Sequence, residues 1–205
     1  MKLFIFKLGM VFSYIIPYVF LSFKQRCINK FYSGWISRNF KFFGNSTTLH
    51  HVRSLVGAKY ISIGDYTTIG RKAILTAWDC QNGNEFSPMI TIGSGCTIGD
   101  YAHITAICNI TIGNNVLTGN NLLITDNAHG TLDAQYMQKH PATRPLISKG
   151  SVVVEDCVWI GSNVSILSGV RIGKGSIIGT GSVVTMNIPS NSIAVGVPAK
   201  IIKTI

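Results

Sequence analysis

Aliphatic residues recur with a period of six along most of the chain, from Ile61 onward. The most regular stretch places them at Val154, Ile160, Ile166, Ile172, Ile178 and Val184, and glycine often follows. This period is too long for one strand face and differs from the three or four positions of a helix. It fits short strands joined by tight corners, with one inward aliphatic side chain per side that stacks on its counterpart in the next coil. Three sides give a triangular coil of 18 residues, the separation of Val154 from Ile172.

A second set of small or apolar residues lies four positions after each aliphatic residue, and we expect it to point inward too. It comprises Thr67, Ala73, Cys96, Ala102, Cys108, Val116, Ala128, Val158, Val164, Ser176 and Ser182. The composition agrees with many tight corners around a buried core, because the chain has 21 glycines, 46% hydrophobic residues and only 13% charged residues. We therefore predict an all-β solenoid.

Departures from the 18-residue spacing predict where the solenoid is interrupted. The spacing is 29 residues from Ile63 to Ile92, 20 from Ile92 to Ile112 and 42 from Ile112 to Val154. These excesses predict a loop near residues 77–89, a small bulge near 107–110 and a long insertion within 126–151. Long loops in a regular scaffold usually carry function, so the last insertion is the first place to look for a site.

Residues 1–43 form a separate apolar and basic segment. Residues 8–23 are uncharged and mostly large and apolar, and Lys24, Arg26 and Lys30 follow closely. Residues 1–60 hold nine of the 18 basic residues and no acidic residue. The apolar run is short for a membrane span, which needs about 20 residues, and Pro17 interrupts it. No small-x-small site closes the apolar run and no alanine precedes Ala58, so cleavage as a signal peptide is not expected.

Aromatic and basic residues interleave through this segment, as is typical of the lipid headgroup layer. We predict that this segment forms short helices that lie on an anionic membrane surface. The protein is then cytoplasmic and associated with the inner face of the membrane. The alternative is that these helices pack on the main domain or on a partner subunit. The five cysteines lack CxxC pairing, which favours a reducing compartment. No nucleic-acid-binding motif accompanies the basic residues, so a nucleic-acid partner is not expected.

Two further stretches accompany the repeat. Residues 116–130 read VLTGNNLLITDNAHG and end next to His129, and residues 179–200 run from GTGSVVTMNIP to AVGVPAK. Together with the repeat, they resemble the hexapeptide-repeat acyltransferases, which include galactoside and maltose O-acetyltransferases and O-acetyltransferases of surface polysaccharides. The resemblance covers residues 61–205. It implies a left-handed parallel β-helix over residues 44–188, a coenzyme-binding tail over 189–205, and a homotrimer with coenzyme A between neighbouring subunits.

Acetyl transfer to a hydroxyl needs a base for the hydroxyl proton, and histidine suits this role near neutral pH. His129 opens the long insertion and precedes Gly130, whose missing side chain permits close approach of a ligand. We predict His129 as the general base, with Asp126 orienting its imidazole. His103 precedes a repeat position, and we place it on a different side of the coil in a structural role. His140 has no assigned role, and His50 and His51 are taken as structural.

The resemblance also assigns the coenzyme-binding positions. The matching residues are Trp159, Ser162, Thr180, Thr185 and Lys200. Lys200 is expected to meet a phosphate of the coenzyme. Met186 stands where relatives commonly have lysine, and Gly99 stands where the galactoside enzymes place a substrate-binding asparagine, which argues against a simple galactoside acceptor.

Cys96 and Cys108 fall at inward positions and Cys157 at a corner, so direct transfer is preferred to a cysteine-bound acyl intermediate. No metal is expected, because the histidine spacing does not match the zinc site of γ-class carbonic anhydrases. We predict an acetyl-CoA-dependent O-acetyltransferase that acts on a sugar of a surface polysaccharide or its lipid-linked precursor. The alternatives are a drug-modifying or amino-sugar N-acetyltransferase and a non-catalytic trimeric scaffold.

Overall fold

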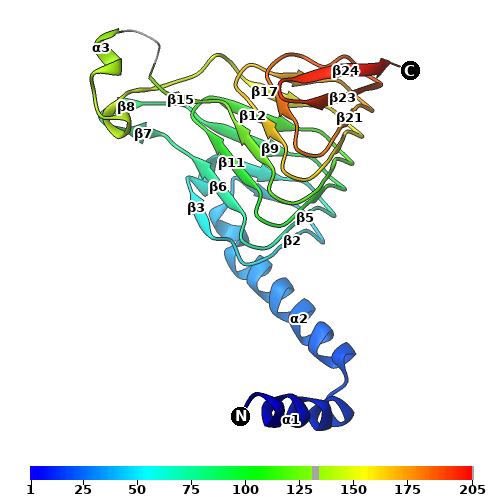
Figure 1. Cartoon of the computed structure of the whole chain (residues 1–205). Helices are drawn as coiled ribbons and strands as arrows, with labels where there is room; N and C mark the ends of the chain where they lie inside the picture. The colour runs from blue at the N-terminus through cyan, green and yellow to red at the C-terminus, as the bar shows by residue number, and fades with distance from the viewer. Residues whose placement is uncertain (131–133, 205) are drawn as a thin grey trace.

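The computed structural model describes residues 1–130 and 134–204. Two helices, α1 (Lys2–Ile15) and α2 (Tyr18–Ile36), come first and are followed by a short 3₁₀ turn, η1 (Ser37–Asn39). The chain then winds into a stack of coils, and the two termini lie at opposite ends of the molecule (Figure 1). A second 3₁₀ turn, η2 (Ala58–Tyr60), precedes the second coil.

Three sheets, here called A, B and C, form the sides of the stack, and their strands are parallel except for the last strand of sheet B. Sheet A contains β1 (Phe42–Phe43), β4 (Ile61–Ile63), β9 (Met89–Ile92), β12 (Asn109–Ile112), β17 (Val152–Val154) and β20 (Arg171–Ile172). Sheet B contains β2 (Thr48–Leu49), β5 (Thr68–Ile69), β10 (Thr97–Ile98), β13 (Leu117–Thr118), β18 (Trp159–Ile160), β21 (Ile177–Ile178), β23 (Ser192–Gly196) and β24 (Ala199–Thr204). Sheet C contains β3 (Ser54–Val56), β6 (Ile74–Ala77), β11 (His103–Ala106), β14 (Leu123–Thr125), β19 (Ser165–Ile166) and β22 (Val183–Val184). The predicted parallel β-helix is confirmed, and its left-handed winding stays a prediction.

The strand register places the interruptions where the spacing predicted them. Ile63 pairs with Ile92, Ile92 with Ile112, and Ile112 with Val154. The first insertion forms an antiparallel hairpin of β7 (Cys80–Gln81) and β8 (Asn84–Glu85). The second contains β15 (Ala128–His129), α3 (Ala134–Met137), η3 (Pro141–Thr143) and β16 (Leu146–Ile147). Residues 131–133 of this predicted loop lie outside the described residues.

The aliphatic positions of the repeat are buried along the whole stack, as expected. Two positions of the second inward set were predicted wrongly, because Cys108 and Ala128 are exposed. Ile107 is buried at the corner where Cys108 was expected to point inward. Ala128 has already left the coil and belongs to the strand that starts the long insertion. The six-residue period therefore predicts the wrong inward residue where a corner is enlarged or the chain leaves the stack.

The last turns of α2 pack against the first coil. The buried residues of α2 are Asn29, Ser33 and Ile36. The Ser33 hydroxyl accepts a hydrogen bond from the Leu49 N–H at 2.9 Å, and the Lys30 ammonium donates to the Ser46 carbonyl at 2.9 Å. These contacts fix the end of α2 on the β-helix.

The rest of the N-terminal segment is exposed. No residue of α1 is buried, and large apolar side chains project from it along its whole length. Neither α1 nor α2 alone has the length and hydropathy of a membrane span. α1 and the stretch Tyr18–Asn39 meet the criterion only as a pair, bent by 80°.

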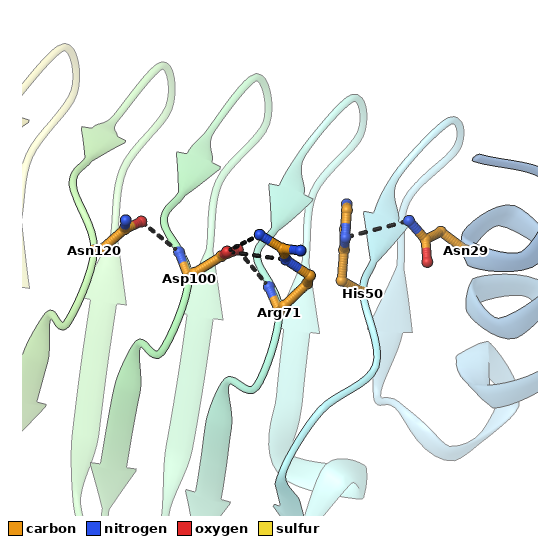
Figure 2. A network of polar contacts seen from close by, with 5 residues as sticks. All are labelled: Asn29, His50, Arg71, Asp100 and Asn120. Atoms are coloured by element: carbon orange, nitrogen blue, oxygen red, sulfur yellow. Dashed lines mark hydrogen bonds and ion pairs between the residues drawn. The ribbon is translucent and has the colours of Figure 1, made fainter. Parts of the chain in front are cut away.

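A ladder of polar side chains runs along the corner between sheets B and C (Figure 2). The Asn29 amide contacts His50 Nδ1 at 3.2 Å, and the Arg71 guanidinium donates twice to Asp100, at 3.0 and 2.8 Å. The Asp100 N–H donates to Asn120 Oδ1 at 2.9 Å. Side chains thus connect successive coils at this corner, where the strands have ended.

The end of the chain extends sheet B rather than leaving the stack as a separate tail. β23 pairs in parallel with β21, and β24 folds back antiparallel on β23. At the other boundary, the β-helix begins at β1, two residues before the predicted start at residue 44. Of the predicted tail at 189–205, residue 205 lies outside the described residues.

Candidate active site

The long insertion leaves the stack after β14, and a buried carboxylate fixes this point. Asp126 is fully buried. Its two carboxylate oxygens accept hydrogen bonds from the Ile107 N–H at 2.9 Å and the Cys108 N–H at 2.8 Å. The Ser168 hydroxyl donates to the Asp126 carbonyl at 2.8 Å and accepts from the Lys149 N–H at 2.7 Å. Both ends of the insertion are therefore held to the coils.

Asp126 is expected to support the fold of this corner more than the chemistry. Asp126→Ala removes the acceptor for two backbone N–H groups, one of them buried, so we expect the free energy of unfolding to fall by about 2–4 kcal/mol. Asp126→Asn keeps one acceptor oxygen and is expected to lose less. Thermal or urea unfolding of the parent protein and the two variants measures their relative stabilities. Equal stabilities would show that the two bonds are dispensable.

His129 is exposed on a two-stranded ribbon next to this fixed point. β15 pairs antiparallel with β16, which places His129 opposite Leu146. Gly130 follows with a φ of 79°, in the left-handed region that glycine adopts at little cost, and the Arg144 side chain lies against it. The close approach at Gly130 is thus to Arg144 of the same insertion.

A pocket of about 370 Å³ contains His129 and a second histidine, His103. The described residues that line it are Ser54, Ile74, Thr76, Trp78, Gln81, His103, Thr105, Asn127, His129 and Leu146. His103 lies on β11 and pairs with Leu123 of β14, the strand that leads to His129. The expectation that His103 occupies a different side of the coil is therefore wrong. The six-residue period does not reveal over which strands the insertion folds.

Burial lowers the pKa of His103 below its ordinary value, and nearby Arg53 lowers it further. The imidazole of His103 is consequently neutral at pH 7, with one nitrogen that donates and one that accepts hydrogen bonds. Gln81 was not singled out from the sequence. Its Oε1 is buried and has no hydrogen-bond partner among the described residues.

A second pocket of about 240 Å³ lies on the other side of the ribbon. Its described lining comprises Thr125, Asn127, Ala128, Ile147, Lys149, Leu167, Ser168 and Thr185. Asn127 lines both pockets, and its side-chain amide donates to the Thr105 carbonyl at 3.3 Å. The ribbon that carries His129 therefore stands between two hollows on the outer side of sheet C.

The five predicted coenzyme residues lie at three places on the β-helix. Trp159, which is 53% exposed, and Lys200 lie on sheet B. Ser162 follows β18 and Thr180 follows β21, so the two residues lie in successive coils at the corner after sheet B. A Cβ at Gly161 would lie 2.6 Å from the Thr180 backbone nitrogen, so glycine is required for this stacking. Thr185 lies across sheet C in the smaller pocket.

The remaining histidines have local contacts. His50 contacts Asn29, and the ring of His51 stacks on Tyr32 with centroids 5.5 Å apart. His140 Nδ1 accepts a hydrogen bond from the Ala142 N–H at 3.2 Å. Within residues 1–130 and 134–204, no group of three or more His, Cys, Asp or Glu side chains is arranged to hold a metal ion.

Comparison with known proteins identifies the repeat. Residues 151–185 match the family described as bacterial transferase hexapeptide (six repeats). The chain is 37% identical over 109 residues to WbbJ of Escherichia coli (strain K12), named as a lipopolysaccharide biosynthesis O-acetyl transferase. It is 43% identical over 56 residues to a 2,3,4,5-tetrahydropyridine-2,6-dicarboxylate N-acetyltransferase of Staphylococcus aureus (strain JH9). These alignments cover 52% and 27% of this chain, and 56% and 23% of the relatives.

Solved structures agree in fold. A hexapeptide-repeat acetyltransferase of Vibrio cholerae superposes with a TM-score of 0.55 and 27% identity, over 82% of this chain and 75% of that one. AntD, an N-acyltransferase of Bacillus cereus in complex with dTDP-4-amino-4,6-dideoxyglucose and coenzyme A, superposes with a TM-score of 0.65 over 81% and 84% of the two chains. AntD is 21% identical and supports the fold alone. The predicted resemblance to hexapeptide-repeat acyltransferases is confirmed.

Proposed function

We propose that this chain, which carries the hexapeptide repeat of bacterial transferases, is an acetyl-CoA-dependent O-acetyltransferase. Its acceptor is a sugar hydroxyl of a surface polysaccharide or of its lipid-linked precursor. The observation that carries the proposal is the position of His129, exposed on a ribbon between two pockets. The similarity to WbbJ supports the O-acetyl and polysaccharide parts. The proposal includes left-handed winding and the 18-residue triangular coil.

The proposed reaction is a direct transfer. His129 takes the proton of the acceptor hydroxyl as its oxygen attacks the thioester carbonyl, which gives a tetrahedral intermediate. Collapse of this intermediate breaks the carbon–sulfur bond, and the His129 imidazolium returns the proton to the leaving thiolate. The products are an acetyl ester and coenzyme A. The bonds to Asp126 support this role by fixing the ribbon's base, and no step needs a metal ion.

The acceptor enters from the larger pocket and the acetyl thioester from the smaller one in this proposal. Thr185 and Lys149 line the smaller pocket, and the proposal assigns to them the contacts with the thioester arm. Trp159, Ser162, Thr180 and Lys200 contact the rest of the coenzyme along sheet B and its corner. The chain forms a homotrimer in this arrangement, with the coenzyme between neighbouring copies.

The N-terminal segment places the enzyme on the inner face of a membrane in this proposal. Exposed apolar residues cover α1, and the segment carries basic residues with no acidic residue to offset them. An anionic bilayer complements both properties. Membrane attachment brings a soluble β-helix to a lipid-linked acceptor.

An amine acceptor is the second candidate. It rests on the similarity to the staphylococcal N-acetyltransferase, which covers about a quarter of this chain. The same base would take a proton from an amine, so the two candidates differ in the acceptor and not in the role of His129.

Coenzyme binding and thiol release test the proposed function. Titration calorimetry of the full chain with acetyl-CoA is expected to give saturable heat, and a colorimetric thiol assay is expected to report coenzyme A release when a glycan acceptor is added. Mass spectrometry of surface glycans from cells with and without the gene locates the added acetyl group. Absence of acetyl-CoA binding would favour the scaffold alternative.

A further inference from the structure

We infer that the larger pocket, here called the His129 pocket, binds an uncharged sugar ring of the acceptor, and that Gln81 determines this specificity by accepting a hydrogen bond from a sugar hydroxyl. The inference rests on the proposed function only for the chemistry at His129. Sugar binding is inferred from the lining of the pocket, to which both insertions of the β-helix contribute.

The two insertions are joined by a hydrogen bond. The Asn82 side-chain amide, at the turn of the β7–β8 hairpin, donates to the Ala142 carbonyl of the long insertion at 2.9 Å. At the base of the hairpin, Asp79 accepts a hydrogen bond from the Tyr60 hydroxyl at 2.9 Å and pairs with Lys59 at 3.1 Å. Gln81 is therefore carried by a segment held at both ends.

Among the residues that the structure describes, the lining of the His129 pocket contains polar but no charged side chains. None of its ten described residues is Asp, Glu, Lys or Arg. Arg53 acts on His103 electrostatically but is not part of the lining. A carboxylate or ammonium group that entered would lose hydration without gaining an ion pair from Asp, Glu, Lys or Arg of the described lining, and such burial is costly. The pocket therefore favours a neutral ligand.

The polar groups that are present suit hydroxyls. Gln81 Oε1 is a buried acceptor with no donor within the described part of the chain, and buried polar groups in folded proteins are nearly always hydrogen-bonded. Neutral His103 and the hydroxyls of Ser54, Thr76 and Thr105 offer both donors and acceptors. A sugar ring supplies hydroxyls in both roles, and Trp78 adds a flat apolar surface and one N–H donor. The volume, about 370 Å³, lies in the range of small-molecule sites, about 300–1,000 Å³.

The test measures binding without turnover. Ligand-detected saturation-transfer NMR is applied to the full chain with p-nitrophenyl β-D-glucoside, β-D-galactoside and N-acetyl-β-D-glucosaminide as neutral probes, and with p-nitrophenyl β-D-glucuronide as the anionic probe. We expect at least one neutral probe to bind, and to bind about tenfold or more tightly than the glucuronide.

Substitutions at the hairpin separate the hydrogen bond from the fold. Gln81→Met keeps the size of the side chain and removes the acceptor, and it is expected to weaken neutral-probe binding about tenfold. Glu85→Gln, on the same hairpin and outside the pocket lining, is expected to leave binding unchanged. Thermal unfolding of both variants checks that the chain still folds.

Three results would overturn the inference: no neutral probe binds, the glucuronide binds as tightly as the neutral probes, or folded Gln81→Met binds as well as the parent protein. Thiol release from acetyl-CoA is measured separately. Gln81-dependent glycoside binding without thiol release under any acceptor would refute the proposed transferase function and leave the pocket assignment standing.

Discussion

His129→Ala is expected to lower kcat by roughly 10²- to 10⁴-fold, the usual contribution of a general base. The affinity for acetyl-CoA is expected to stay unchanged, because the substitution acts on the transition state and the predicted coenzyme residues lie elsewhere. Steady-state kinetics by thiol release gives kcat, and titration calorimetry gives the coenzyme affinity. The exposure of His129 means that its removal leaves no cavity in the core.

His140→Ala provides the matched control within the same insertion. His140 is exposed and its ring accepts a hydrogen bond from the Ala142 N–H, so its loss is expected to change kcat little. A His129→Ala protein that retains more than a tenth of the parent rate, while folded, would remove His129 from the mechanism. Trapping of an acetylated cysteine during turnover would instead replace direct transfer by an acyl-enzyme route.

Deletion of residues 1–23 is expected to abolish binding to anionic vesicles. The deletion removes α1 and the first six residues of α2 but retains Asn29, Ser33 and Ile36, through which α2 packs on the first coil. The β-helix and its pockets are therefore expected to remain folded, with unchanged transfer to a small soluble acceptor. Co-sedimentation with phosphatidylserine vesicles measures binding, and high salt is expected to release part of the intact protein.

Charge and apolar insertion can be separated in the full chain. Lys24→Gln with Arg26→Gln is expected to weaken binding to anionic vesicles by about 1 kcal/mol per residue before screening, with no effect on neutral vesicles. Lys72→Gln with Lys139→Gln, which removes two exposed charges outside residues 1–43, is the matched control. If the deletion disrupts the oligomer while vesicle binding persists, the N-terminal segment is a packing element and the membrane proposal is wrong.

The sequence predicted the stack well because its signal is local and repeated. Each inward aliphatic residue, such as Ile112, meets an equivalent in the next coil, so the spacing alone gives the register and the insertion points. The period carries no information on how an insertion folds. His103 was therefore placed on the wrong side, and Gln81 was missed.

The backbone contacts of Asp126 are a second feature that the sequence alone does not predict. The predicted role of Asp126 in orienting the His129 imidazole stays a prediction, and both of its carboxylate oxygens accept hydrogen bonds from backbone N–H groups of the preceding coil. Hydrogen bonds from backbone N–H groups to a carboxylate are strong and hold the side chain in this position. The two donors, on Ile107 and Cys108, are 19 and 18 residues away in the sequence. Only the stacking of coils brings these groups together.

The packing of α2 on the first coil also determines how copies of this chain can assemble. A stack of coils has an open end whose strand edges offer unpaired backbone groups, and identical molecules could add there without limit and form a fibre. At the N-terminal end of the stack, the Leu49 N–H already donates a hydrogen bond to the Ser33 hydroxyl. Near the C-terminal end, the antiparallel strand β24 pairs with β23 of sheet B. Solenoid proteins rely on such terminal caps for solubility. Growth along the axis is thereby discouraged, and association through the flanks, as a closed trimer requires, is the route left open.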